Sequence, residues 1–282
     1  MALEIKPLRG EFGGEVVGLN LAKEGAAAHA DIRKAWLKHG VLLFRDQRFS
    51  DTSLVEFSCQ FGGLEPNPAS EKHESGTGRV PEVWIISNVV ENGEPIGALG
   101  AGEAEWHTDM SYIAEPPMGS ILYAWEVPDE GGNTWFLDMR AAYRSLPDDL
   151  RNALVNRRAN HSSSLTSVGD LRRGATAPTD VTKEPGAKHP VVRTHPETGT
   201  KALYLGRRSW AYIEGFEVDK SEELLDRLWD HCRQPEFMFK HKWRSGDLIM
   251  WDNRCVMHRR DPFDPKTRRI MYRTQIKGDQ PR

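Results

Sequence analysis

The stretch Trp106-His107-Thr108-Asp109 places an imidazole and a carboxylate two residues apart. On an extended backbone, residues i and i+2 point to the same side, so this spacing fits the end of a β-strand. His258 supplies a second imidazole far along the chain. Two histidines and one carboxylate are the ligands of the facial triad that holds non-haem Fe(II). We therefore expect His107, Asp109 and His258 to meet within one β-structure and to bind a metal ion.

Short runs rich in β-branched and aromatic residues predict many strands. The runs cover residues 40–45, 83–90, 120–127, 134–138, 191–194, 202–205, 237–243, 247–251 and 269–276. Turn-forming residues separate them, as in residues 128–133 (Pro-Asp-Glu-Gly-Gly-Asn). This pattern indicates a mainly β chain with flanking helices. A double-sheet jelly roll fits, because ligands from different strands can converge at its open end.

Four segments carry apolar residues at helical spacing. They are residues 30–39, 53–61, 139–158 and 222–232. Ser53 and Glu56 have the spacing of a capping box, which predicts a helix start. Pro147 predicts that a new helix begins within the third segment.

Residues 160–188 form a long polar segment, rich in Ser, Gly, Thr, Pro and Lys. A polar loop of this length inside a compact domain is usually a lid or a disordered excursion. We treat it as a candidate active-site lid, and an uninvolved surface loop is the alternative.

Composition bounds the class of protein. The 282 residues carry a net charge of −3, so the chain lacks the basic field that attracts nucleic acid. No apolar run is long enough to span a bilayer, and the first residues lack the apolar core of a signal peptide. Three scattered cysteines argue against a disulfide framework. We expect one cytoplasmic enzyme domain over residues 1–282, without nucleic-acid or membrane partners.

The segment from Arg268 to Arg273 places Arg269 and Arg273 on one face of a predicted strand. Burying two arginines is costly unless each has an anionic partner. Guanidinium groups clamp carboxylates or sulfonates through paired hydrogen bonds, so Arg269 and Arg273 are candidate anion-binding residues. A solvated edge is the alternative, and we accept it for Arg268.

Together these motifs resemble the Fe(II)/2-oxoglutarate dioxygenases of the taurine and dichlorophenoxyacetate type. The resemblance covers nearly the whole chain and implies a double-stranded β-helix, the cupin-like jelly roll. It rests on His107-x-Asp109, residues 128–134 ending in Gly-Gly-Asn-Thr, Trp251-Asp252-Asn253-Arg254, His258, and arginines eleven and fifteen residues beyond it. Residues 138–143 and 236–243 look more like the dichlorophenoxyacetate branch.

The resemblance implies a role for each matching position. The iron ligands would be His107, Asp109 and His258. Thr134 and Arg269 would bind the distal carboxylate of 2-oxoglutarate, and Arg273 would meet the anionic group of the substrate.

Two further positions differ from the taurine branch. Asn67 stands where that branch has a histidine that contacts the sulfonate, and Ser209 stands where it has an aromatic residue lining the pocket. Both are therefore candidate substrate-binding positions, and taurine itself is disfavoured as the substrate.

The implied reaction hydroxylates a small organic anion while 2-oxoglutarate and dioxygen yield succinate and CO2. An aryloxyalkanoate-like carboxylate fits, because hydroxylation beside its ether oxygen would give a hemiacetal that collapses. A sulfonate or sulfate-ester dioxygenase of the same family is the first alternative. A metal-dependent hydrolase using Zn(II) and a non-catalytic binding protein are the others. Thr134 and Arg269 argue against a hydrolase, which needs no second anion site. Family members are commonly dimers or tetramers, so we expect a homo-oligomer.

Overall fold

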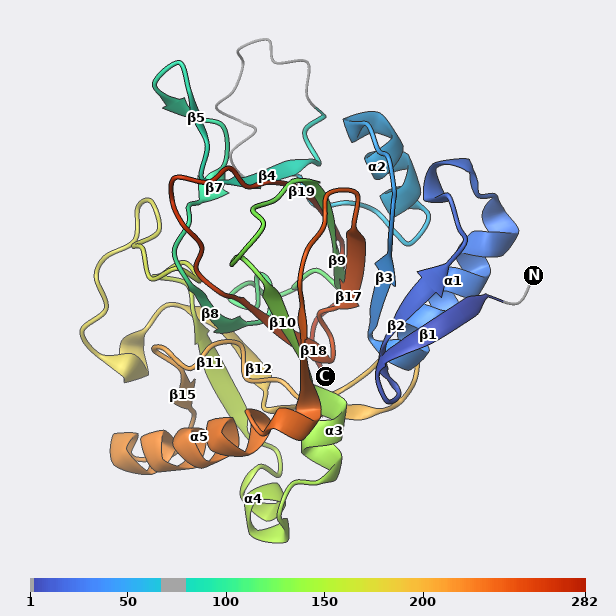
Figure 1. Cartoon of the computed structure of the whole chain (residues 1–282). Helices are drawn as coiled ribbons and strands as arrows, with labels where there is room; N and C mark the ends of the chain where they lie inside the picture. Colours follow the sequence, from blue (N-terminus) through green and yellow to red (C-terminus); the bar gives the residue numbers. More distant parts are fainter. Residues whose placement is uncertain (1–2, 67–79) are drawn as a thin grey trace.

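Two sheets form the centre of the structure, a computed structural model that describes residues 3–66 and 80–282 (Figure 1). The larger sheet has the order β1-β2-β3-β17-β9-β19-β4-β7. Its strands, in that order, are Glu4–Arg9, Phe12–Val17, Val41–Phe44, Leu248–Asp252, Gly119–Glu126, Ile270–Ile276, Trp84–Ser87 and Ala98–Leu99. Only the pairs β2–β3 and β4–β7 are parallel among these neighbours.

The smaller sheet is antiparallel and has the order β16-β10-β18-β8. Its strands are β16 (Met238–His241), β10 (Thr134–Asp138), β18 (Val256–Arg260) and β8 (Ala104–His107). The register places His258 of β18 opposite Phe136 of β10 on one side and His107 of β8 on the other. The predicted mainly β jelly roll with flanking helices is confirmed.

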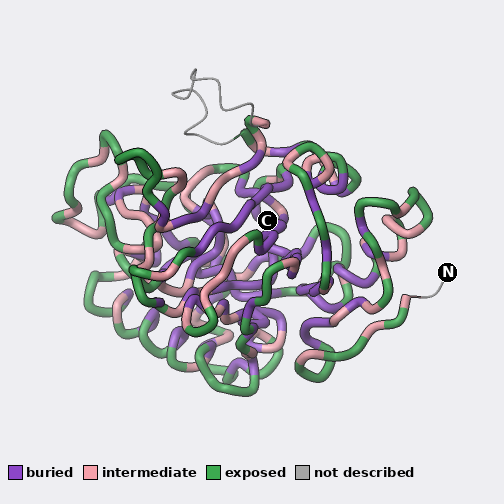
Figure 2. The backbone as a smooth tube through the Cα atoms, turned by 45° about the horizontal axis from the view of Figure 1, so that its top comes forward, coloured by how far each residue is buried: buried purple, intermediate pink, exposed green. Residues whose placement is uncertain are grey.

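Both faces of the larger sheet are buried at its central strands. On β3, Leu43 joins the core cluster that contains Phe136 of the smaller sheet, whereas Leu42 joins the cluster that contains Trp36 of helix α1 (Ala26–His39). The central strands therefore consist of continuous apolar runs instead of alternating ones. Figure 2 shows this buried interior in purple, with exposed backbone in green around it.

The helices agree with the predictions in number and differ at their ends. Helix α2 (Asp51–Cys59) begins earlier than predicted. Its capping box joins Ser50 to Ser53, so the predicted pairing of Ser53 with Glu56 is wrong. The third predicted segment divides at Pro147 into α3 (Met139–Arg144) and α4 (Asp148–Ala153), as expected. Helix α5 spans Val218–Cys232.

The predicted polar loop at 160–188 is shorter than expected, because both of its ends are strands. β11 (Arg158–Ser162) pairs with β12 (Gly186–Pro190) and β15 (Tyr212–Ile213). Glu184 forms hydrogen bonds with two polar side chains of β11. Asn160 donates to the backbone carbonyl of Glu184 (2.7 Å), and Ser162 donates to the carboxylate of Glu184 (2.6 Å).

The remaining elements are short. They are the hairpins β5 (Val90–Glu91) with β6 (Glu94–Pro95) and β13 (Val192–Thr194) with β14 (Lys201–Leu203), and the 3-10 helices η1 (Leu21–Lys23), η3 (Val181–Lys183) and η4 (Pro235–Phe237).

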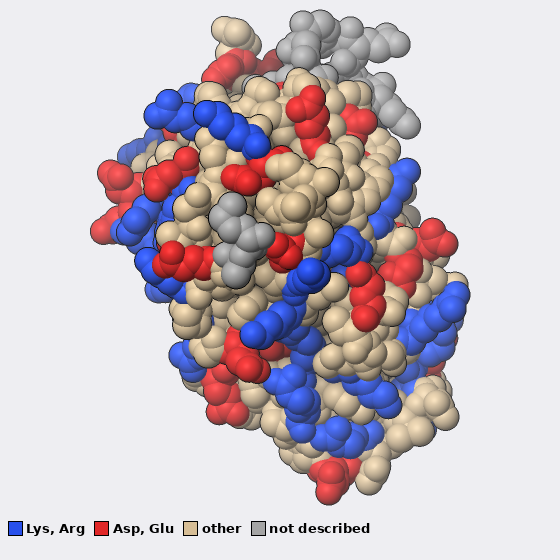
Figure 3. Space-filling view, turned by 90° about the vertical axis from the view of Figure 1, so that its right-hand side faces the viewer, with Lys and Arg blue, Asp and Glu red and all other residues tan. Residues whose placement is uncertain are grey.

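Three surface and chemical features bear on the predictions from composition. Within residues 3–66 and 80–282, no helix has both the length and the apolarity of a membrane span. The three cysteines are free thiols, as predicted. Acidic and basic side chains are interspersed on the face drawn in Figure 3.

Candidate active site

The structure brings His107, Asp109 and His258 together in the buried interior. His107 ends β8, and His258 lies directly opposite it on β18. The Nε2 atoms of His107 and His258 lie 3.6 Å and 4.0 Å from Asp109 Oδ1. The three ligand atoms all lie within 4.8 Å of one another, so the cluster could hold one metal ion.

The surroundings of the two imidazoles suit metal ligands. His107 Nδ1 lies 2.7 Å from the backbone carbonyl oxygen of Glu105, which can only accept a hydrogen bond. The proton therefore resides on Nδ1, and the Nε2 lone pair faces Asp109. Burial, assisted by the nearby His107, lowers the pKa of His258 to about 3. Since a metal binds the neutral imidazole, both histidines fit the facial triad.

A chain of hydrogen bonds orients Asp109. Ser120 Oγ donates to Asp109 Oδ2 (2.7 Å), and Asn253 Nδ2 donates to Ser120 Oγ (2.9 Å). Trp251 Nε1 in turn donates to Asn253 Oδ1 (2.9 Å). These bonds engage Oδ2 and leave Oδ1 turned toward the histidines. Sequence analysis identified Trp251 and Asn253 only as parts of a motif and missed Ser120.

Arg273 is buried, and its partner is the carboxylate of Asp109. Arg273 Nη1 donates to Asp109 Oδ1 (3.2 Å), and its guanidinium lies 4.8 Å from the ring centre of Trp84. Burial alone would raise the pKa of Asp109, but Arg273 and His258 hold that pKa well below its usual value. The anionic partner expected for this arginine is therefore supplied by the metal-donor cluster itself.

Arg269 and Thr134 line the same cavity as the two histidines. Arg269 is 2% exposed, and burial together with the neighbouring Arg260 lowers its pKa to about 9. Thr134 Oγ1 accepts a hydrogen bond from Trp243 Nε1 (2.9 Å). The hydroxyl hydrogen of Thr134 is therefore available to a ligand in the cavity. Arg273 lines this cavity too, so both predicted anion-binding arginines face one space.

Sequence analysis missed Arg260, which also lines the cavity. It lies two residues after His258 on β18 and directly opposite Thr134 on β10. The signal was present in the i, i+2 spacing from His258, but residues 256–260 were not recognised as a strand.

Among the other predicted positions, Ser209 does not line this cavity. Ser209 is exposed, and its hydroxyl donates to Glu105 Oε2 (2.8 Å). Asn67 lies outside the described residues. The candidate lid contributes Ser167 to the cavity lining. Arg207 holds this segment through its bonds to the backbone carbonyls of Ser162 (3.0 Å) and Thr166 (2.6 Å).

A second buried group of metal-ligand type contains His195, Asp252 and Cys255. Arg254 binds both oxygens of Asp252, at 2.8 Å and 2.7 Å. His195 Nδ1 accepts from the backbone N–H groups of Glu197 and Thr198, both at 3.2 Å. The imidazole proton is therefore on Nε2, which donates to Asp252 (3.0 Å). Burial also raises the pKa of the Cys255 thiol, so this cluster is a hydrogen-bonded network without free donor atoms for a metal.

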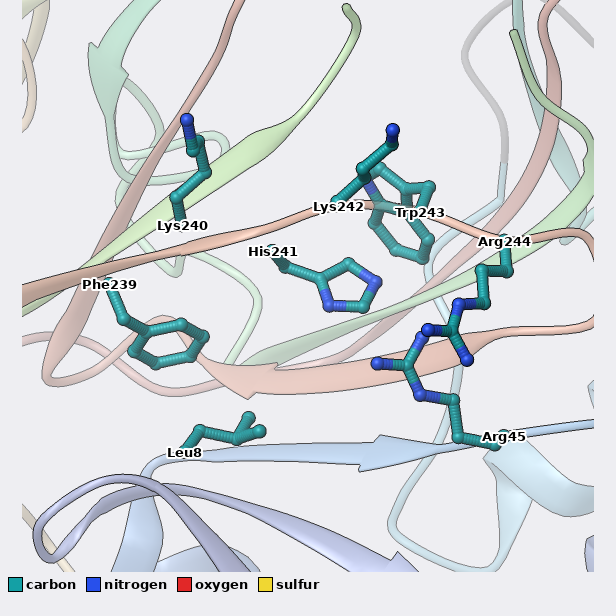
Figure 4. Close-up of a pocket in the computed structure, with 8 residues that line it drawn as sticks. All are labelled: Leu8, Arg45, Phe239, Lys240, His241, Lys242, Trp243 and Arg244. Carbon is teal, nitrogen blue, oxygen red and sulfur yellow. The ribbon is translucent and has the colours of Figure 1, made fainter. Parts of the chain in front are cut away.

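A separate surface pocket of about 380 Å³ lies beside β16 (Figure 4). Arg45 and Arg244 extend toward each other in it, and Trp243 forms part of its wall. Because Trp243 also bonds to Thr134, this indole stands between the surface pocket and the metal-donor cavity. The pocket contains no part of the His107 cluster.

Jelly roll and site together define a class, the 2-oxoglutarate-dependent dioxygenases. Within it the chain belongs to the taurine catabolism dioxygenase TauD, TfdA family, whose model matches residues 4–275. This membership confirms the resemblance stated above and favours the oxygenase over the hydrolase and the non-catalytic binding protein.

Several relatives resemble nearly the whole chain. The (S)-phenoxypropionate/alpha-ketoglutarate-dioxygenase of Sphingobium herbicidovorans is 34% identical over 283 residues, 99% of this chain and 96% of the relative. The alpha-ketoglutarate-dependent 2,4-dichlorophenoxyacetate dioxygenase of Cupriavidus pinatubonensis is 33% identical over 99% of both chains. An alpha-ketoglutarate-dependent sulfate ester dioxygenase of Pseudomonas putida is 29% identical over 100% of this chain and 91% of the relative.

A solved structure extends the likeness to the fold. The crystal structure of AAD-2 in complex with Mn(II) and N-oxalylglycine matches with a TM-score of 0.80 and 34% identity, over 100% of this chain and 99% of that chain. The predicted affinity with the dichlorophenoxyacetate branch is confirmed, and use of 2-oxoglutarate is common to the named relatives.

Proposed function

We propose that this protein hydroxylates an aryloxyalkanoate-like carboxylate, using Fe(II), 2-oxoglutarate and dioxygen and releasing succinate and CO2. The observation that carries the proposal is one cavity lined both by the two histidines of the metal-donor cluster, His107 and His258, and by the buried cation Arg269. A hydrolase would use the cluster but has no need for the cation.

The metal-donor end and the Arg269 end of the cavity have different roles in the proposed reaction. His107, Asp109 and His258 would hold iron, which supplies the activation of dioxygen when bound. Arg269 binds the distal carboxylate of 2-oxoglutarate through its planar fork, and the hydroxyl of Thr134 donates to the same carboxylate. Apolar walls such as Ile86 and Leu122 exclude water from the reacting atoms.

Arg273 binds the anionic group of the substrate. Its present partner, Asp109 Oδ1, is also the oxygen nearest to both histidines. A metal ion held by the cluster would share the negative charge of that oxygen, and Arg273 would then be available to bind the anionic group of the substrate. Metal binding and substrate binding therefore support each other through one carboxylate.

Anaerobic titration of the protein with Fe(II) and 2-oxoglutarate tests the reaction class. We expect a weak visible charge-transfer band, and its absence would contradict the proposal. Succinate release over a panel of aryloxyalkanoates, sulfonates and sulfate esters then identifies the substrate. Sulfate esters are the second candidate, because a sulfate ester dioxygenase is among the relatives and a guanidinium binds either anion.

Two variants separate the roles of the arginines. Arg269→Lys keeps the charge but loses the fork, so the KM for 2-oxoglutarate should rise. Loss of one buried pair costs roughly 2–5 kcal/mol. Arg273→Ala should leave this KM largely unchanged while the KM for the substrate rises and 2-oxoglutarate is consumed without hydroxylation. The same defect in 2-oxoglutarate binding for both variants would contradict the assignment of Arg273.

The proposal extends to the polar segment between β11 and β12 as a lid, because Ser167 lines the cavity. Limited proteolysis should cleave it less when Mn(II), 2-oxoglutarate and substrate are present, and equal cleavage would argue against a lid. We also propose a cytoplasmic homo-oligomer. The free thiols support a reducing compartment, and light scattering tests the subunit count.

A further inference from the structure

Arg260 is a buried cation that lines the same cavity as Arg269. Residues i and i+2 of a strand share a face, so Arg260 points to the same side of β18 as His258. Across the sheet it is paired with Thr134. The guanidinium groups of Arg260 and Arg269 lie 5.6 Å and 5.8 Å from the ring centre of Phe263, and both residues line the metal-donor cavity.

The two cations have no carboxylate partner among the described residues. Arg260 Nη2 donates to the backbone carbonyls of Leu99 (2.9 Å) and Gly102 (2.5 Å). The Nε atoms of Arg260 and Arg269 are buried without a hydrogen-bond partner. The adjacent Arg259, in contrast, pairs with Glu103 (3.0 Å) and Asp261.

Two buried cations that line one cavity repel each other and lose hydration, so an anion bound in that cavity is strongly favoured. A carboxylate has two oxygens with about four acceptor sites. The fork of Arg269, the hydroxyl of Thr134 and one N–H of Arg260 do not exceed this capacity. Backbone carbonyls hold only one end of Arg260 and do not neutralise its charge.

We propose that Arg260 is a second cation for the distal carboxylate of the 2-oxo acid and makes the site selective for dicarboxylic over monocarboxylic 2-oxo acids. This inference rests on the proposed function. It goes further in giving selectivity for the co-substrate to a residue two positions beyond a metal-donor histidine.

A purely structural role for Arg260, tying down the segment of Leu99 and Gly102, predicts a different outcome. Two ligands separate the two roles. 2-Oxoglutarate and 2-oxopentanoate have the same chain length, but only the first carries the distal carboxylate. A direct effect of Arg260 depends on that carboxylate, whereas a structural effect weakens both ligands.

The experiment is anaerobic calorimetry of the Mn(II)-loaded protein with each ligand. Arg260→Gln should weaken 2-oxoglutarate binding by roughly tenfold or more and leave 2-oxopentanoate binding unchanged. Arg259→Gln is the matched control, since it removes the neighbouring cation outside the cavity, and it should alter neither affinity. Equal weakening of both ligands in Arg260→Gln, or no weakening, overturns the proposal.

A wild-type measurement covers the case in which Arg260→Gln does not fold. In a crystal structure with Mn(II) and 2-oxoglutarate, an Arg260 nitrogen should lie within hydrogen-bond distance of the distal carboxylate, and a longer distance to both oxygens overturns the proposal. Failure of the underlying function has its own signature. The wild type would then bind 2-oxoglutarate no more tightly than 2-oxopentanoate.

Discussion

The described part of the chain contains two buried clusters of similar composition and opposite character. Asp109 with its two histidines forms one, and His195 with Asp252 and Cys255 forms the other. In the second cluster, hydrogen bonds and protons occupy the donor atoms that a metal would need. In the first, backbone and side-chain bonds engage the far atoms of His107 and Asp109, so that Nε2 and Oδ1 face a shared space. The residue types do not distinguish a metal site from a structural network. The arrangement of donor atoms does, because His107 Nε2 and Asp109 Oδ1 face one another, although Arg273 also donates to that oxygen.

His107→Ala gives the strongest test of the contrast between the two clusters. We expect complete loss of bound metal and of turnover, because a facial triad with two ligands no longer encloses the ion. Metal content per chain by mass spectrometry and succinate release measure the two effects, with circular dichroism as the control for folding. Full activity in this variant would contradict the assignment of the first cluster.

Asp252→Asn tests the second cluster, the one formed by His195, Asp252 and Cys255. It removes one of the two carboxylates that pair with the buried Arg254 and leaves Glu197 (2.6 Å) as the other, so the free energy of unfolding should fall by up to roughly 3–5 kcal/mol. Metal content per folded chain should stay at the wild-type value. Chemical denaturation and metal analysis test this pair of outcomes. A folded variant that has lost its metal would mean that the two clusters are not independent.

Ser120→Ala sharpens the comparison by removing the bond that orients Asp109. Metal affinity should fall roughly 10–100-fold, the usual effect of losing a partner behind a metal ligand. Ser58→Ala is the control, because the Ser58 hydroxyl is also buried but bonds to Leu54 and Thr274 instead. Competition with a metal chelator gives both affinities, and equal values for the two variants would argue against this role of Ser120.

Trp243→Phe should have the smallest effect. It removes the donor that fixes Thr134, and a neutral hydrogen bond contributes about 0.5–1.5 kcal/mol. The KM for 2-oxoglutarate should therefore rise a few-fold. Trp135→Phe removes a comparable indole donor that bonds to Asp261, and it should leave this KM unchanged. A similar change in both variants would indicate a general effect of losing an indole from this sheet.

Sequence patterns predicted the parts of the fold whose burial is visible locally. The central parts of β3, β9 and β17 are buried on both faces, so each contains an apolar run that a window of residues can detect. Strand β19 is also buried, but Arg273, Thr274 and Gln275 interrupt its apolar residues. Strands β1 and β2 were missed, because β1 contains Pro7 and mostly unburied residues, and β2 contains Gly13 and Gly14. Their extended form depends on pairing with each other and with β3.

The site divides in the same way. The spacing of His107 and Asp109 and the alternation of Arg269 and Arg273 are local, so the sequence predicts that these side chains share a face. Contacts between distant residues leave no such signal. Ser120 and Asn253 lie 133 positions apart and meet only in the folded sheet. Arg260 follows Arg259 in a basic pair that looks like solvated surface until the strand register separates the two.

The short strand β18 has one more consequence. It pairs with β10 without interruption, so His258 and Arg260 are two residues apart on a regular strand and about 7 Å apart along it, at roughly 3.3 Å per residue. The backbone of β18 therefore fixes the distance between the metal end of the cavity, at His258, and the cation end, at Arg260. Side-chain substitutions can change the affinity of either end for a dianion. The rise per residue along β18 sets how long a dianion must be to reach both His258 and Arg260. Inserting or deleting a residue in β18 would change that length.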